Sequence, residues 1–137
     1  IIGVADNGRK NPLFDLKERC SMVQQDIDNM GSKGCEIEVR AFDNLLIQFA
    51  ADVKASCIFR GLRAVSDFEY EVQLAAMNRR LQWEVETLFL APAEQFTFIS
   101  SSLIRQIAAL GGDVSQFVAP CVQQALQQQL ADKKQSS

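Results

Sequence analysis

Two arginines, Arg60 and Arg63, carry the clearest chemical meaning in this sequence. Each guanidinium offers a planar fork of N–H donors, which matches the oxygens of a phosphate group. Gly61 follows Arg60 and allows close approach of a ligand to the backbone, because glycine has no Cβ. The pattern suits phosphate binding. The alternative is a pair of surface arginines bridged to nearby carboxylates, which are those of Asp67, Glu69 and Glu71.

A run of three serines, Ser100 to Ser102, is the second candidate site. It precedes a helical pattern, so its hydroxyl and backbone N–H groups would lie at a helix N-terminus, where the helix dipole favours an anion. Arg105 adds positive charge one to two turns further on. A plain serine N-cap would account for one of these serines. The run of three favours phosphate binding.

Alternating strands and helices must position these residues. The apolar patterns predict strands over residues 1–5, 35–41, 56–60 and 86–91, and helices over 15–30, 44–54, 67–81 and 100–110, with a last helix from Pro120. Asp15 and Glu18 form a capping box, Asp67 caps the third helix, and a glycine pair follows the fourth. On the third helix, Leu74, Met77 and Leu81 share one side.

This order predicts an α/β fold, with a Rossmann-like parallel sheet and helices on both faces. Ligands bind such sheets beyond the carboxyl ends of the strands, which are the loops after residues 5, 41, 60 and 91. The basic loop with Gly8, Arg9 and Lys10 is a third candidate because it follows such an end. We expect residues 1–137 to form one domain, with 132–137 as a flexible tail.

Composition excludes several classes of function. The 137 residues include no histidine, which removes Ser-His-Asp and Cys-His catalysis and histidine-bound zinc. The net charge of -3 disfavours a nucleic-acid or membrane-surface partner. The four cysteines form no CxxC motif, and Cys20, Cys35 and Cys57 fall in apolar patterns. We therefore expect free buried thiols in a cytoplasmic protein.

The segment from Arg60 to Glu71, together with Gln73-Leu74-Ala75 and Met77-Asn78-Arg79, resembles the bacterial phosphopantetheine adenylyltransferase family. Residues 10–14, 42–46, 99–105 and 111–114 resemble the same family in the same order. The resemblance covers nearly the whole chain. Its arginine-rich block is highly specific, whereas other nucleotidyltransferases of the superfamily share variants of the serine block.

The resemblance implies transfer of an adenylyl group from ATP to 4′-phosphopantetheine, giving dephospho-coenzyme A and pyrophosphate in coenzyme A biosynthesis. It places phosphopantetheine at Lys10, Leu46 and Arg60, with Lys10, Arg60 and Arg63 supporting the transfer. The residues that would face ATP are Gly61, Leu62, Arg63, Glu71, Phe96, Thr97, Phe98, Ile99, Ser100, Ser101 and Ser102. It also implies Mg²⁺ with ATP, no metal ligand from this chain, coenzyme A as a feedback ligand, and a homo-hexamer in the cytoplasm.

The sequence departs from the family in one respect. Family members begin with a strand and a glycine-rich loop carrying Thr-x-Gly-His, whose threonine and histidine contact the reacting phosphate. Neither this motif nor any histidine occurs here, and Ile1 matches the start of the family's second strand. We therefore expect the first strand, the first helix and the catalytic residues to lie upstream of Ile1, and residues 1–137 alone to be inactive.

Two alternative functions stay open at this point. One is a non-catalytic nucleotide-binding or assembly module with the same fold. The other is a related nucleotidyltransferase that uses another phosphorylated acceptor.

Overall fold

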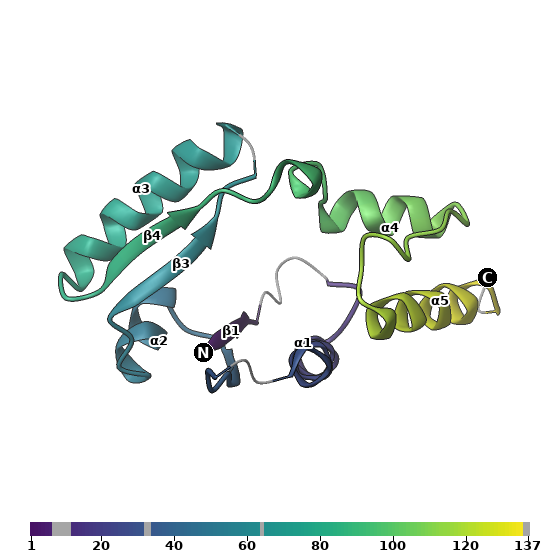
Figure 1. Cartoon of the computed structure of the whole chain (residues 1–137), viewed down its shortest axis with the longest axis horizontal. Helices are drawn as coiled ribbons and strands as arrows, with labels where there is room; N and C mark the ends of the chain where they lie inside the picture. The colour runs from purple at the N-terminus through teal and green to yellow at the C-terminus, as the bar shows by residue number, and fades with distance from the viewer. Residues whose placement is uncertain (7–11, 32–33, 64, 136–137) are drawn as a thin grey trace. The chain divides into compact units, whose positions relative to one another are not determined.

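The structure, a computed structural model, describes residues 1–6, 12–31, 34–63 and 65–135 (Figure 1). The predicted basic loop, including Lys10, lies outside the described residues. The chain divides into two compact units, one formed by Ile1–Asp43 with Ile99–Ser137 and the other by Asn44–Phe98. The Arg60 segment therefore belongs to the second unit and the serine run to the first.

In the first unit, β1 (Ile2–Ala5) pairs in parallel with β2 (Val39–Phe42), and α1 (Leu16–Met30) connects them. Ile2 lies opposite Val39 and Ala5 opposite Phe42. β2 therefore begins at Val39, four residues later than the predicted start at residue 35, because β1 has only four residues with which to pair. Cys35 precedes β2 and is exposed, so the prediction that its thiol is buried was wrong.

The capping box at the start of α1 is confirmed. The Glu18 backbone N–H donates to Asp15 Oδ1 at 2.8 Å, and the Asp15 N–H donates to Glu18 Oε2 at 2.7 Å. One turn into the helix, Arg19 Nη1 donates to the Ala5 carbonyl at 2.8 Å, which ties α1 to the carboxyl end of β1. Met30, in the last turn of α1, is exposed.

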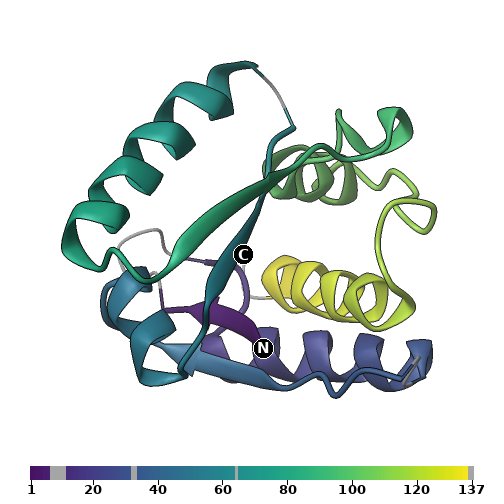
Figure 2. The ribbon, with the colours of Figure 1, turned by 60° about the vertical axis from the view of Figure 1, so that its left-hand side comes forward.

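The core of the first unit is formed by Ile104 of α4 (Ser101–Ala109), Val114 of the following loop and Leu126 of α5 (Pro120–Gln135). In Figure 2, α1 and α5 run side by side, in agreement with their contacts. Pro120 starts α5 as predicted. The helix extends to Gln135, and the flexible tail at 132–137 stays a prediction.

In the second unit, β3 (Cys57–Gly61) pairs in parallel with β4 (Glu86–Leu90), with Arg60 opposite Phe89. The other elements are α2 (Leu46–Asp52), shorter than the predicted 44–54, α3 (Val65–Leu81), and the 3₁₀ turn η2 (Glu94–Phe96). Figure 1 shows α3 running along the β3–β4 pair. Ile47, Ala50 and Val85 form the core.

The start of α3 differs from the prediction. The helix begins at Val65, so Asp67 lies within the first turn and is not the N-cap. A carboxylate is favourable in either place because the helix dipole attracts negative charge throughout the first turn. On the predicted apolar side, Leu74 is half-buried, whereas Met77 and Leu81 are exposed.

The α/β organisation with parallel strands is confirmed. Among the described residues, the strands are hydrogen-bonded as two separate pairs, β1–β2 and β3–β4, rather than as one continuous ladder. No helix in the described parts of the chain has both the length and the apolar character of a membrane span.

Candidate functional site

The second unit places Arg60 and Glu71 in direct contact. Arg60 Nε donates to Glu71 Oε2 at 2.8 Å, and Arg60 Nη2 donates to Glu71 Oε1 at 2.6 Å. Arg60 is the penultimate residue of β3, and Glu71 lies on the second turn of α3. The pair therefore marks the carboxyl end of a parallel strand, where the sequence predicted a ligand.

A small hollow extends from this ion pair. Its walls are mostly apolar and come from α2, α3 and both strands of the unit: Leu46, Ile58, Arg60, Glu71, Leu74, Ala75, Asn78 and Thr87. The structure thus brings together Leu46 and Arg60, the two described residues predicted at the acceptor, with Glu71, predicted at ATP. The space between these side chains is too small to hold a water molecule, so Arg60 and Glu71 lie at one end of a packed seam between the elements.

Both members of the pair are charged at neutral pH. The hydrogen bonds from Arg60 lower the pKa of the Glu71 carboxyl, and partial desolvation opposes this only in part. The same hydrogen bonds raise the pKa of Arg60. The Glu71 side chain is 12% exposed and that of Arg60 is 38% exposed, so the carboxylate is the more enclosed partner.

The three residues after Arg60 have different surroundings. A methyl group added at Gly61 would contact nothing within 4 Å, so the structure leaves open space beside this backbone. The Leu62 N–H donates to the Leu90 carbonyl at 2.9 Å and is used by the strand pair. Arg63 Nε lies 3.5 Å from Asp67 Oδ2, one helical turn further along the chain.

The structure shows the carboxylate-bridged arrangement of the two arginines, and phosphate binding stays a prediction. Each arginine is bridged to a carboxylate, and Arg60 also reaches the hollow. A bidentate carboxylate uses one N–H of Nε and one of Nη2, so three N–H groups of Arg60 are not used by Glu71.

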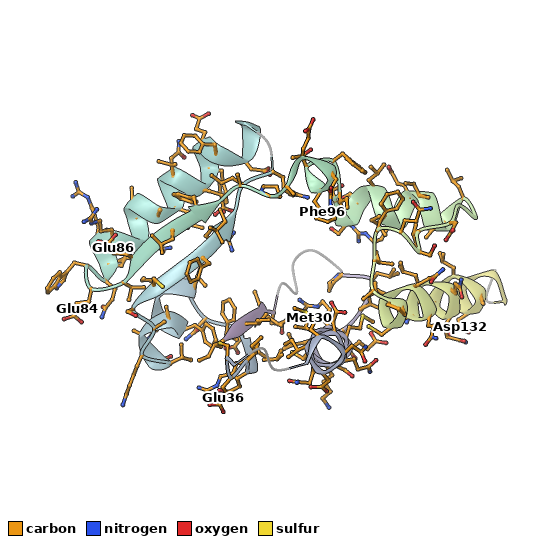
Figure 3. All side chains as sticks on the ribbon, viewed as in Figure 1. Met30, Glu36, Glu84, Glu86, Phe96 and Asp132 are labelled. Carbon is orange, nitrogen blue, oxygen red and sulfur yellow. The ribbon has the colours of Figure 1, made fainter. Side chains whose placement is uncertain are left out.

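The turn η2 presents the apolar residues predicted at ATP. Phe96 is 49% exposed and is labelled in Figure 3, and Phe98 is also exposed. The Thr97 hydroxyl donates to the Glu94 carbonyl at 2.8 Å, which closes the turn. The hydroxyl of Thr97 is therefore engaged locally.

In the first unit, the serine run starts α4 as predicted. Ser100 is the N-cap and its hydroxyl accepts the Leu103 N–H at 3.2 Å, whereas Ser101 and Ser102 are exposed. Arg105 Nε donates to the Ser101 carbonyl at 3.2 Å, which keeps its charge beside the helix start. Ser100 thus serves as an ordinary cap, and the neighbouring serines leave an open face. Ile99, directly before the cap, is half-buried.

Sequence reasoning quoted Asn78 but gave it no role. It is 6% exposed, it is the one polar residue among the buried residues described, and it lines the hollow. The sequence spacing could have indicated its place, because positions 71, 74, 75 and 78 fall on one face of a helix and Glu71 was already a candidate site residue. Thr87, the eighth residue of the lining, gives no such signal, because only the pairing of β4 with β3 places it opposite Ile58.

A second hollow, in the first unit, was not predicted. It lies between the loop after α4 and α5, with Leu126 and Val114 among its apolar lining and Gln123 and Asp113 among its polar lining. Gly112 makes this turn possible, because a Cβ there would lie 2.5 Å from Ile107 Cγ2. The Asp113 carboxylate accepts from the Ser115 N–H, which lowers the pKa of Asp113.

No group of three histidine, cysteine or acidic side chains converges among the described residues. The carboxylates nearest the candidate site, Glu71 and Asp67, are each paired with an arginine. The described residues therefore do not form a protein cage for a metal ion.

Comparison with known proteins identifies relatives of the chain. Residues 1–107 match the family model described as cytidylyltransferase-like. Over 134 residues, 98% of this chain and 81% of the relative, the sequence is 53% identical to a phosphopantetheine adenylyltransferase of Hahella chejuensis (strain KCTC 2396). Over 133 residues, 97% of this chain and 73% of the relative, it is 49% identical to the enzyme of the same name from Rhodospirillum centenum (strain ATCC 51521 / SW).

Proposed function

We propose that this chain, which belongs to the phosphopantetheine adenylyltransferase family, holds its phosphorylated acceptor at Arg60. The reaction is transfer of the adenylyl group of ATP to 4′-phosphopantetheine in coenzyme A biosynthesis. An oxygen of the acceptor phosphate bonds to the α-phosphorus of ATP, the bond between the α-phosphorus and its bridging oxygen breaks, and pyrophosphate leaves. Dephospho-coenzyme A is the other product.

The orientation of Arg60 at the carboxyl end of β3, fixed by its two hydrogen bonds to Glu71, is the observation that supports the acceptor assignment. Leu46 of α2 lies beside the same pair, and we propose it as a contact of the pantetheine arm on the family resemblance. The three N–H groups of Arg60 not used by Glu71 suit the terminal phosphate. Lys10 is proposed as a further acceptor contact on the family resemblance alone.

For ATP, we propose contacts in each unit separately. In the second unit, the open space at Gly61 admits the nucleotide close to the backbone, with Leu62, Arg63 and the segment Phe96–Phe98, which starts at the last residue of η2, beside it. In the first unit, the helix start at Ile99, Ser100, Ser101 and Ser102 supplies N–H donors to a phosphate. Adenylyl transfer depends chiefly on positioning and charge neutralisation, and these residue types provide both.

We propose Mg²⁺ as the divalent ion that accompanies ATP. The described residues form no group of three metal ligands. The phosphate oxygens of ATP and water molecules would therefore supply most of the ligands of the Mg²⁺ ion. The ion would neutralise phosphate charge. The residues described here act on the acceptor and on the nucleotide itself.

We also propose the cellular setting of the enzyme. Four free cysteines fit the reducing cytoplasm. A homo-hexamer and feedback by coenzyme A follow from the family resemblance. The same resemblance gives no reason to expect a nucleic-acid or membrane partner.

The test is Arg60→Ala in the full-length enzyme, with Arg79→Ala as matched control. Arg79 pairs with Glu86 at 3.1 Å on an exposed surface away from the hollow's lining. Binding of phosphopantetheine and of unphosphorylated pantetheine is measured by calorimetry for each variant. Loss of charge-assisted hydrogen bonds predicts about 10- to 100-fold weaker phosphopantetheine binding for Arg60→Ala only, with pantetheine little changed.

Folding is monitored by thermal melting in the same samples. Arg60→Ala leaves Glu71 without its partner, so a lower melting temperature is expected and binding is measured well below it. If Arg60→Ala keeps the wild-type preference for the phosphorylated acceptor, the assignment is wrong.

A further inference from the structure

We propose that Arg19 is a positioning residue for the acceptor site, because it links the two ends of the basic loop that contains Lys10. The inference rests on the proposed function, which takes Lys10 as an acceptor contact. It gives a task to Arg19, which is not among the site residues that the family resemblance implies.

The chain on either side of this loop is held in place. On the strand side, the Asp6 N–H donates to the Phe42 carbonyl at 2.7 Å, which continues the pairing of β1 with β2. On the helix side, Leu13 and Phe14 pack against the core of the first unit. Lys10 lies between these two points in the sequence, outside the described residues.

Arg19 joins the two sides directly. It lies one turn into α1, and its Nη1 donates to the Ala5 carbonyl at 2.8 Å. This hydrogen bond links the last residue of the strand before the loop to the helix after it. A link of this kind reduces the conformations open to the residues between its ends. A loop restricted in advance loses less entropy when its side chains bind a ligand.

The surroundings of Arg19 favour such a task over a purely stabilising one. The side chain is half-buried, and its Nε and Nη2 atoms are buried with no hydrogen-bond partner among the residues that the structure describes. None of the ion pairs in the described part of the chain includes it. Buried N–H groups without acceptors, above all on a charged group, destabilise a fold. An apolar side chain of similar length would avoid that cost, so stability alone does not explain an arginine at this position.

The experiment is Arg19→Met in the full-length enzyme, with Arg40→Met as the matched control. Arg40 lies in the same unit and pairs with Glu38 at 2.6 Å on an exposed surface. Steady-state kinetics give KM for phosphopantetheine and for ATP. We expect Arg19→Met to raise the phosphopantetheine KM about 5- to 20-fold and to leave the ATP KM within about twofold of wild type. Arg40→Met should leave both constants unchanged.

Thermal melting and a conservative variant separate positioning from stability. Arg19→Met removes the bond to Ala5 but also removes the buried N–H groups without acceptors, so its melting temperature should stay close to that of wild type. Arg19→Lys keeps the charge and one donor for the Ala5 carbonyl. We expect it to restore the phosphopantetheine KM to within about threefold of wild type.

A double-mutant cycle with Lys10→Ala gives a readout that a purely structural role would not move. If Arg19 acts through Lys10, Arg19→Met raises the phosphopantetheine KM in wild type but raises it no further in Lys10→Ala. The cycle is measured well below the melting temperature of each variant.

Two outcomes would overturn the inference. One is a phosphopantetheine KM in Arg19→Met equal to that of wild type, and the other is an additive increase in the double variant. Failure of the proposed function is read from other variants, which keep Arg19. Lys10→Ala with the wild-type phosphopantetheine KM would remove the contact at Lys10, and Arg60→Ala with the wild-type phosphate preference would remove the contact at Arg60.

Discussion

Arg60 and Glu71 lie eleven residues apart in the chain, and their side chains meet in two parallel hydrogen bonds at the carboxyl end of β3. The pair joins a strand to the helix that follows it, at one end of a seam that apolar side chains share with Asn78 and Thr87. It therefore contributes both to the stability of the second unit and to the chemistry proposed for it. The first two predictions concern this pair.

Acidification should weaken the fold through Glu71. Its pKa is lowered by Arg60 in the folded state, so its contribution to stability is present above the unfolded value of about 4.3 and is lost as pH falls through the lower folded value. We expect wild type to exceed Glu71→Gln in the free energy of unfolding at pH 7, and the difference to shrink below about pH 4.3. Urea unfolding at a series of pH values measures it, and a difference that does not change with pH would contradict the prediction.

Arg60→Lys should separate charge from geometry. A lysine keeps the positive charge beside Glu71 but cannot form the two-pronged contact or present a planar end to a phosphate. We expect the melting temperature to fall less than in Arg60→Ala, whereas the phosphopantetheine KM rises about tenfold. Thermal melts and steady-state kinetics on both variants are the measurements. Equal acceptor KM values for Arg60→Lys and wild type would show that charge alone suffices.

The serines of α4 should divide into a structural and a binding group. Ser100→Ala removes the hydroxyl that accepts the Leu103 N–H, and loss of an N-cap costs about 1 kcal/mol of stability. Ser102→Ala removes an exposed hydroxyl and should leave stability nearly unchanged while raising the KM for ATP. Chemical unfolding and ATP kinetics on the two variants decide this. A larger loss of stability in Ser102→Ala than in Ser100→Ala would contradict the division.

Gly61 and Gly112 should respond oppositely to a methyl group. A Cβ at Gly61 meets nothing within 4 Å, so Gly61→Ala should fold with unchanged or slightly raised stability and bind ATP more weakly, because the methyl group fills the space proposed for the nucleotide. A Cβ at Gly112 lies 2.5 Å from Ile107 Cγ2 and 3.1 Å from its carbonyl oxygen, so Gly112→Ala should lower the melting temperature. A lower melting temperature for Gly61→Ala than for Gly112→Ala would contradict the prediction.

Cys35 should be the first thiol to react with a neutral alkylating reagent. It is exposed, whereas Cys20, Cys57 and Cys121 are partly buried. Access to the reagent then limits the other three. Peptide mapping after brief treatment with iodoacetamide should find label mainly at Cys35, and Cys35→Ser should remove the fast phase. Predominant early labelling at Cys57 would contradict the described burial.

Several local features could be predicted because they depend on residues three or four positions apart. The capping box of Asp15 and Glu18 and the cap at Ser100 each satisfy N–H groups that every helix start leaves open. The parallel α/β organisation was also predictable, because strands that alternate with long helices connect in parallel. Element ends were less predictable: β2 begins late because its partner β1 is short, and α3 begins two residues before Asp67.

The candidate site shows where the sequence by itself reached its limit. Residue types and resemblance predicted a site at Arg60, Arg63 and Glu71, because guanidinium groups beside a glycine at a strand end suit phosphate chemistry. They left Asp67, Glu69 and Glu71 as equal partners for the two arginines. Only the tertiary structure assigned Glu71 to Arg60, because the packing of α3 along β3 brings the second turn of the helix, and not the first, to the end of the strand. Arg63 pairs with Asp67, which lies four residues further along the chain. Glu69 is exposed and is in neither of these two ion pairs.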